Sequence, residues 1–240
     1  MDYAALFAIF SRSFLFTVAT LLPIINPLAA APIFLSLTSG VSPTSRKKLS
    51  ERIGINLFIM LTVAIFSGNM VLSFFGISLP IIRIGGGLLV IATAWKLVNA
   101  TGSDTEEAID RAEGYSIDRL RAKAFYPLTF PIICGPGTIA ATLTVGATLS
   151  DPSTLVSMTK LSAAILALLT VSVITYVCLR FAAPFLTRLG TNGTAILMRL
   201  SAFILLCLGV QIAWDGLSEI TLELLVEAAQ RSAEFIPTSK

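Results

Sequence analysis

The stretch that decides the fold is residues 22–38, which read LPIINPLAAAPIFLSLT. It lies inside a longer run, residues 13–45, that contains no charged residue. About 20 apolar residues of helix cross the ~30 Å hydrocarbon core of a bilayer, so this run is long enough to span a membrane. Within it, Asn26 and three prolines interrupt residues 22–38, which predicts a broken span rather than a straight one.

The rest of the chain has a similar composition. Of its 240 residues, 55% are hydrophobic and 13% are charged, and the mean hydropathy is +0.86. Soluble domains carry about 25% charged residues. Three further uncharged runs, at 53–82, 124–150 and 161–179, reach or approach the length of a membrane span. The composition therefore predicts a polytopic membrane protein and excludes a soluble enzyme, a nucleic-acid binder and a disordered chain.

We predict one all-α membrane domain over residues 1–240, with six spans at about 5–38, 53–75, 79–98, 124–149, 161–181 and 194–214. Each span must be a helix, or a broken helix buried in protein, because lipid offers no partner to free backbone groups. We do not expect the first span to be a cleaved signal peptide. It is longer than the apolar region of a signal peptide, and further apolar segments of similar length follow it.

Basic residues mark one side of the membrane. Twelve of the 17 Lys and Arg residues follow the first, third and fifth spans: Arg46, Lys47, Lys48, Arg52, Lys96, Arg111, Arg119, Arg121, Lys123, Arg180, Arg188 and Arg199. Lys and Arg accumulate on the cytoplasmic side. We therefore expect a cell inner membrane protein with both termini outside, a cytoplasmic connector at 100–122 and an outer amphipathic tail at 218–240.

The two halves of the chain resemble each other. Residues 23–27 read PIINP and residues 131–136 read PIICGP. The third and sixth spans each begin near an arginine, Arg83 or Arg199, and end in Ala-Trp. We interpret 1–99 and 123–217 as two three-span repeats with broken first helices. Because three is an odd number, the halves enter the membrane from opposite sides, an inverted repeat found in many secondary transporters.

A second register of the repeat is also open. It matches two sets of three prolines that have the same spacing: Pro23, Pro27 and Pro32 with Pro127, Pro131 and Pro136.

The breaks are the candidate binding site. Asn26-Pro27 and Gly135-Pro136 are each predicted to begin a half-helix, because Asn and Gly suit the N-cap and Pro suits the first helical position. Helix starts carry amide N–H groups and a positive dipole end that bind carboxylates and other anions. Gly137 lets a ligand approach the backbone, and Asn26 and Thr138 add polar side chains. Two facing starts would bind a small zwitterion or anion at the midplane; the alternative is that the prolines only kink the helices.

Three further polar side chains fall within the spans. Arg83, Arg199 and Gln211 are candidates for solute binding, because charged and polar groups in spans are often functional. The alternatives are that the arginines reach to the interface and that Gln211 bonds a neighbouring helix.

Several kinds of chemistry are not expected. The chain has no His, its three Cys lie in apolar segments, and no Asp or Glu lies near the middle of a span. We therefore predict no enzyme activity, no metal or other cofactor and no carboxylate proton relay. A coupling ion, H⁺ or Na⁺, would need backbone carbonyls or amides.

Three motifs resemble the MarC family of membrane proteins. They are LPIINPL at 22–28 with PIFLSLT at 32–38, FGIS at 75–78 with RIGGG at 83–87, and PL at 127–128 with GPGTIA at 135–140. The resemblance covers nearly the whole chain and agrees with six spans and outward termini. Because the family is grouped with small neutral amino-acid transporters of prokaryotic inner membranes, it implies a carrier for substrates such as glycine or alanine.

Two other functions are weighed against a transporter. A passive pore would show a continuous polar stripe along its spans, which the sequence lacks. A non-transporting protein, such as a scaffold or an antibiotic-resistance accessory, would need a broad partner surface, and no loop is long enough to supply an obvious one.

The sequence leaves open the substrate, the direction of transport, the coupling ion and the oligomeric state. The expected partners are a small neutral amino acid and the lipid bilayer.

Overall fold

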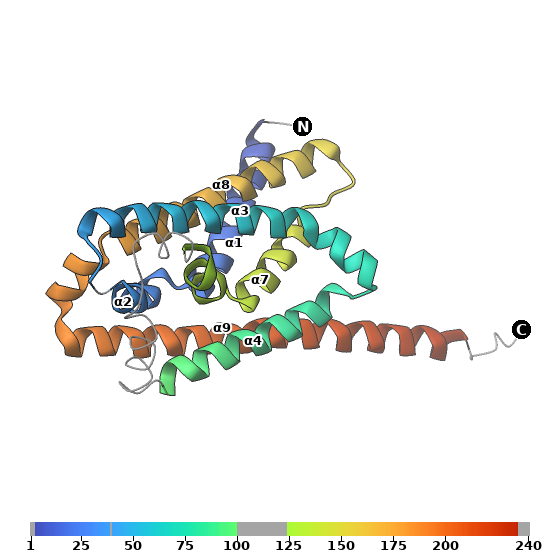
Figure 1. The fold of residues 1–240 in the computed structure, drawn as a ribbon. Helices are drawn as coiled ribbons and strands as arrows, with labels where there is room; N and C mark the ends of the chain where they lie inside the picture. Colours follow the sequence, from blue (N-terminus) through green and yellow to red (C-terminus); the bar gives the residue numbers. More distant parts are fainter. Residues whose placement is uncertain (1–2, 39, 100–123, 235–240) are drawn as a thin grey trace, which may run out of the picture.

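The computed structural model describes residues 3–38, 40–99 and 124–234, and all regular structure in these ranges is helical (Figure 1). In chain order the elements are α1 (Tyr3–Ile25), α2 (Pro27–Leu37), α3 (Pro43–Phe75), α4 (Leu79–Asn99), the irregular helical segment η1 (Ala124–Ile133), α7 (Pro136–Ala147), α8 (Thr154–Arg180) and α9 (Ala182–Glu234). The predicted connector at 100–122 and the end of the predicted tail, 235–240, lie outside the described residues.

The described helices match the spans predicted from apolar length. Five stretches are long and apolar enough to cross a membrane, and the bent pair of η1 and α7 makes up to six. This pair bends by 73° at its break. The first stretch contains α1 and α2, which are separated at Asn26. The first and fourth predicted spans are therefore the broken ones.

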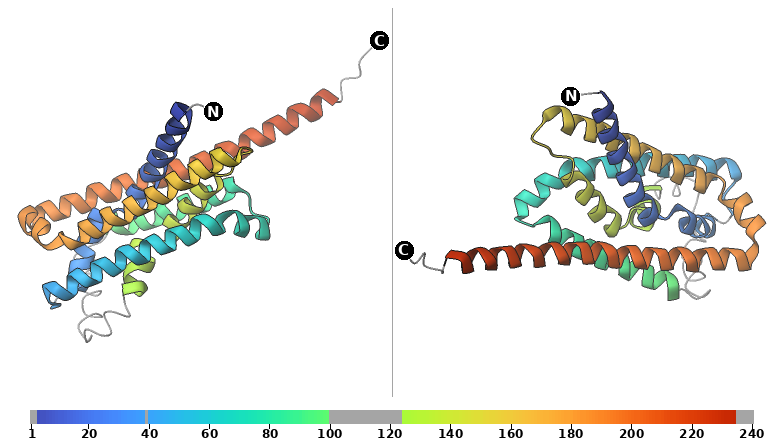
Figure 2. Two further views of the ribbon diagram at one scale, coloured as in Figure 1. Left: turned by 90° about the horizontal axis from the view of Figure 1, so that it is seen from above. Right: turned by 180° about the vertical axis from the view of Figure 1, so that it is seen from behind.

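Two helices are longer than the spans predicted for them. α3 begins at Pro43, where Ser42 accepts a hydrogen bond from the N–H of Ser45. The basic residues at 46–52 therefore lie on its first turns. α9 is interrupted only at Gly190, where φ is 69°, and it passes the predicted boundary at 217/218 without a break. Its end projects beyond the other helices (Figures 1 and 2).

The short helices of the two breaks lie inside the bundle. α3 packs on α8, and α4 packs on α9. α2 lies against α8 and α9, whereas α7 lies against α3 and α4, so both fill the space between the two pairs (Figure 1). Apolar side chains fill the centre: Leu21, Phe34, Ile53, Leu57, Leu61, Val145, Leu168 and Val171. Each short helix therefore packs mainly on helices of the opposite half of the chain.

α4 and α9 run antiparallel and approach closely through glycines. A Cβ on Gly87 would lie 2.5 Å from the backbone N of Ala213, and one on Gly209 would lie 2.8 Å from the N of Ile91. One on Gly216 would lie 2.5 Å from the carbonyl O of Pro80. Only residues without a side chain allow this spacing, as in other glycine-mediated membrane helix pairs.

Candidate functional site

Asn26 separates α1 from α2. Its φ of 47° and ψ of 62° place it in the left-handed region, which Asn tolerates better than most residues. Its N–H donates to the carbonyl of Leu22 at 3.0 Å and closes α1. Its Oδ1 accepts from the N–H of Ala29 at 3.3 Å, and its carbonyl accepts from the N–H of Ala30 at 3.1 Å. The predicted N-cap at Asn26 and helix start at Pro27 are confirmed. The left-handed backbone of Asn26 was not predicted from the sequence.

Gly135 separates η1 from α7. Its backbone is extended, with φ −76° and ψ 173°, and its carbonyl accepts from the N–H of Ile139 at 3.1 Å. Pro136 occupies the first turn, as predicted. Gly135 has no side chain that caps α7, whereas Asn26 caps α2. On the other side of this break, the N–H of Cys134 donates to the carbonyl of Thr129 at 2.7 Å.

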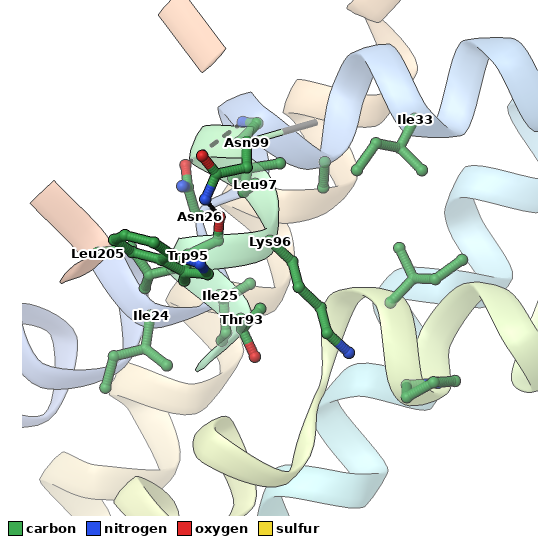
Figure 3. Close-up of a pocket in the computed structure, with 14 residues that line it drawn as sticks. Ile24, Ile25, Asn26, Ile33, Thr93, Trp95, Lys96, Leu97, Asn99 and Leu205 are labelled. Atoms are coloured by element: carbon green, nitrogen blue, oxygen red, sulfur yellow. Dashed lines mark hydrogen bonds between the residues drawn. The ribbon is translucent and has the colours of Figure 1, made fainter. Parts of the chain in front are cut away.

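Both broken segments line one cavity of about 900 Å³ (Figure 3). The first segment supplies Asn26 and its apolar neighbours, and the second supplies Pro131 and Ile132. The last turns of α4 form another wall, and Leu205 of α9 completes it. The lining residues are Ile24, Ile25, Asn26, Ala29, Ala30, Ile33, Thr93, Trp95, Lys96, Leu97, Asn99, Pro131, Ile132 and Leu205. The cavity therefore joins the first break at Asn26 to the part of the second broken segment that precedes Gly135.

The cavity is apolar with a few polar groups. Among the described residues that line it, Lys96 is the charged one and none is acidic. The amide of Asn26 uses its oxygen to cap α2, which leaves the amide nitrogen as the group that a solute would meet. Asn99 donates to the carbonyl of Trp95 at 2.9 Å, so part of the donor capacity of its amide is already used. A positive charge and amide groups on an apolar wall favour a small solute that carries a carboxylate.

Other predicted site residues lie elsewhere. Pro136 lines a second, apolar cavity of about 380 Å³, together with Gly85 and Gly86. A Cβ on Gly137 would lie 2.5 Å from Cγ2 of Val90, so this glycine serves helix packing. Thr138 is buried, and its carbonyl accepts a hydrogen bond from the hydroxyl of Thr142 at 2.7 Å. Asn26 therefore shares its cavity with Pro131 and Ile132 of the second broken segment. Pro136 lines the other cavity.

The three polar span residues do not line the 900 Å³ cavity. Arg83 forms an ion pair with Glu219 of α9. Gln211 donates to Oδ1 of Asp215, one turn further along α9, at 2.7 Å. Arg199 is exposed on α9.

The polar wall on α4 was not predicted. Thr93, Lys96 and Asn99 recur every three residues, which places them on one face of a helix. This periodicity was the signal available in the sequence, although it does not indicate which segment the face meets. Within the described ranges no three His, Cys, Asp or Glu side chains lie together as metal ligands would.

Comparisons with known proteins identify a family of integral membrane proteins. The profile of the MarC family of integral membrane proteins matches residues 11–221. The chain is 33% identical over 202 residues to the inner membrane protein MarC of Escherichia coli O1:K1, which covers 83% of this chain and 91% of that protein. It is 32% identical, with the same coverage, to MarC of Escherichia coli K12 and of Shigella flexneri. No solved structure matches significantly.

Proposed function

The chain belongs to the MarC family of integral membrane proteins, and on that premise we propose that it is a secondary transporter of small neutral amino acids, such as glycine or alanine. Its relatives are named as inner membrane proteins, and its apolar helices agree with a multi-pass inner membrane protein. The observation that carries the proposal is the cavity that the two broken segments share. Broken helices at matched positions of two repeats form the solute site in many transporters.

The groups around the cavity suit a zwitterion. The ammonium group of Lys96 or the amide nitrogen of Asn26 would bind the carboxylate. Carbonyls that follow Leu22 at the end of α1 would accept hydrogen bonds from the ammonium group of the solute, because a helix end leaves carbonyls without intrahelical partners. Ala29 and Ala30 present only methyl groups, which leaves room for a solute whose own side chain is small.

The contacts between helices support the inverted repeat that we propose. If α2 corresponds to α7, α3 to α8 and α4 to α9, the packing of α2 on α8 and α9 has its counterpart in the packing of α7 on α3 and α4. The pairs α3 with α8 and α4 with α9 each join two corresponding helices.

Basic residues support the orientation that we propose. The beginning of α3 and the ends of α4 and α8 lie toward the same side of the bundle, at the left of Figure 1. These ends carry basic residues, among them Arg46, Lys96 and Arg180. By the positive-inside rule this side is cytoplasmic and both termini lie outside. The cavity beside the end of α4 would then open toward the cytoplasm.

The transport step would be driven by H⁺ or Na⁺. The described residues that line the cavity include no acidic side chain, so backbone carbonyls and amides at the breaks are the groups among them that would hold such an ion.

Counterflow into proteoliposomes tests the proposal. Purified protein is reconstituted with unlabelled glycine inside, and the entry of labelled glycine is measured against empty liposomes. We expect saturable counterflow that glycine and alanine inhibit and that glycinamide, which lacks the carboxylate, does not. Absence of counterflow for every small neutral amino acid would exclude the proposal. Unitary currents in planar bilayers with no saturation would indicate a pore instead.

A further inference from the structure

A groove of about 270 Å³ runs along the outside of the bundle, where α3 and α8 pack side by side (Figures 1 and 2). It is separate from the cavity at the breaks, with which it shares no described lining residue. Its walls include the exposed apolar side chains of Ile55, Leu169 and Val173. Because lipid tails are as apolar as these side chains, an outer groove of this kind can hold an acyl chain.

One end of the groove carries charge. Glu51 lines it, just before the uncharged run that begins at residue 53. The carboxylate of Glu51 lies 4.0 Å from Nζ of Lys47, and both side chains are partly exposed. On α8 the uncharged run ends at Arg180, one turn beyond Tyr176 of the groove. The beginning of α3 and the end of α8 lie toward the same side of the bundle (Figure 1), so this end of the groove lies at the level of lipid headgroups.

The hydroxyl of Ser172 is buried in the wall of the groove without a partner. Ser172 is 3% exposed, and its Oγ makes no hydrogen bond to any described residue. On the same helix, the hydroxyls of Thr170 and Thr175 each donate to the carbonyl four residues earlier. A buried hydroxyl costs free energy unless it is hydrogen-bonded, so an acceptor from outside the chain would stabilise Ser172.

Ser172 lies deeper in the membrane than Glu51. A Cβ on Gly54 would lie 3.5 Å from the carbonyl O of Ser172, which places these two residues at one level. Gly54 follows Glu51 by three residues, which is about 4.5 Å of helix toward the hydrocarbon core. The groove then continues to Phe58 between apolar side chains.

We propose that this groove binds a phospholipid whose headgroup carries a primary ammonium, namely phosphatidylethanolamine. The ammonium group donates to the carboxylate of Glu51, and the phosphate lies beside the ammonium group of Lys47. An ester carbonyl accepts the hydrogen bond from Ser172, and the acyl chain fills the groove as far as Phe58. The site is independent of the solute and of the transport mechanism.

The order of groups along the groove matches their order in such a lipid. In a glycerophospholipid the ester carbonyls lie between the charged headgroup and the acyl chains, as Ser172 lies between the charged end and the apolar end of the groove. From Glu51 to Phe58 the helix rises about 10 Å, about a third of the hydrocarbon core, so the groove holds the first part of one chain.

The acidic side chain in the groove decides between headgroups. The carboxylate of Glu51 repels a headgroup that is only anionic, such as phosphatidylglycerol. Phosphatidylcholine carries a positive charge but has no N–H group, so it cannot donate to a carboxylate. Phosphatidylethanolamine has both the charge and the donors, and charge-assisted hydrogen bonds are the strong ones.

Quenching of tryptophan fluorescence by brominated lipids tests the proposal. Trp95→Phe and Trp214→Phe give a background without tryptophan, and Phe58→Trp then places one reporter at the apolar end of the groove. Ile59→Trp is the matched control, because Ile59 is exposed at nearly the same depth and does not line the groove. Each protein is reconstituted in phosphatidylcholine with a fixed fraction of brominated phosphatidylethanolamine, phosphatidylcholine or phosphatidylglycerol.

We expect brominated phosphatidylethanolamine to bind at Phe58→Trp about threefold to fivefold better than brominated phosphatidylcholine, the effect of one partly exposed ion pair. The three lipids should quench Ile59→Trp equally. Glu51→Gln and Ser172→Ala should each lower the preference at Phe58→Trp. Glu223→Gln, which removes an exposed acid on α9 outside the groove, should leave it unchanged.

Equal quenching by the three lipids at Phe58→Trp would overturn the proposal, and so would a preference for phosphatidylglycerol. A preference for phosphatidylethanolamine that survives Glu51→Gln or Ser172→Ala would overturn it as well.

Native mass spectrometry of the parent chain gives a second reading, because a tryptophan side chain can itself fill the groove. The protein is measured in detergent with equal amounts of phosphatidylethanolamine and phosphatidylcholine. We expect one retained phosphatidylethanolamine, which Glu51→Gln releases. A dimer without bound lipid would show that a second copy of the chain covers the groove, and would overturn the proposal.

Discussion

At the residue scale, Asn26 combines three structural roles at the break between α1 and α2. It adopts a left-handed backbone, closes α1 and caps α2. Its amide also lines the cavity. A residue held in a sparsely populated conformation beside a cavity is a common mark of a functional site.

Replacing Asn26 tests the left-handed backbone. Asn26→Ala loses the cap and places a Cβ-bearing residue of low left-handed propensity at φ 47°, at a cost of roughly 2–4 kcal/mol in unfolding free energy. Asn26→Gly loses the cap but fits the backbone, at a cost below about 1 kcal/mol. Unfolding by denaturant in detergent micelles measures both. Equal losses for the two variants would show that the backbone conformation is not under strain.

Local chemistry made part of the site predictable. Capping depends on neighbours within four residues, so Asn26, Pro27, Gly135 and Pro136 could be assigned to helix starts from the sequence. Which groups share a cavity depends on tertiary packing. The polar face that ends at Asn99 therefore escaped prediction, and Arg83 was expected at the site although it pairs with Glu219.

At the element scale, the contact between α4 and α9 depends on glycines at defined positions. Gly87→Ala would place a methyl group 2.5 Å from backbone of α9, which should lower the unfolding free energy by about 1–3 kcal/mol. Gly85→Ala is the matched control, since nothing lies within 4 Å of the added carbon, and helix propensity favours Ala there. Thermal unfolding in detergent compares the two variants. A stable Gly87→Ala protein would contradict the close contact.

The connection between α7 and α8 gives a prediction about pH. Lys160 donates to Oδ2 of Asp151 at 3.0 Å, and the N–H of Ser153 donates to its Oδ1 at 3.1 Å. The hydrogen bond from Lys160 is the main cause that lowers the pKa of Asp151, followed by the bond from Ser153. The carboxylate therefore stabilises the folded chain above the unfolded pKa of about 3.9, and this contribution is lost as the pH falls through the lowered folded pKa.

Asp151→Asn removes this titration. We expect the variant to be slightly less stable than the parent at neutral pH and equally stable at a pH well below 3.9. Unfolding curves over this range measure the difference. A difference that grows as the pH falls would contradict the assignment.

Helix lengths were predicted less well than helix positions. Uncharged runs locate a span, because charge is excluded from the hydrocarbon core, but a helix need not end where the lipid ends. The residues after Trp214 are rich in Leu, Glu and Ala and contain only one helix-weakening Gly before the end of α9. α9 therefore continues through residues that the charge pattern had assigned to a separate tail.

At the scale of the whole molecule, the scarcity of charge was enough to predict a polytopic helical membrane protein. The broken segments then indicated where the cavity lies, because Asn26 and Pro131 lie in two of the long uncharged runs and line the same space. Under the proposed function, this cavity binds the solute. Lys96 is the charged group among the described residues that line it, so its loss should weaken solute binding most.

The most direct measurement is the glycine concentration that gives half-maximal counterflow in proteoliposomes of Lys96→Gln and of Lys48→Gln. Lys48 is an exposed lysine on the first turns of α3 and does not line the cavity. A hydrogen bond to a charged group is worth about 1.5–3 kcal/mol, so Lys96→Gln should raise this concentration about tenfold or more, while Lys48→Gln should leave it unchanged. Equal values for both variants and the parent would contradict the claim that the cavity between the two breaks binds the solute.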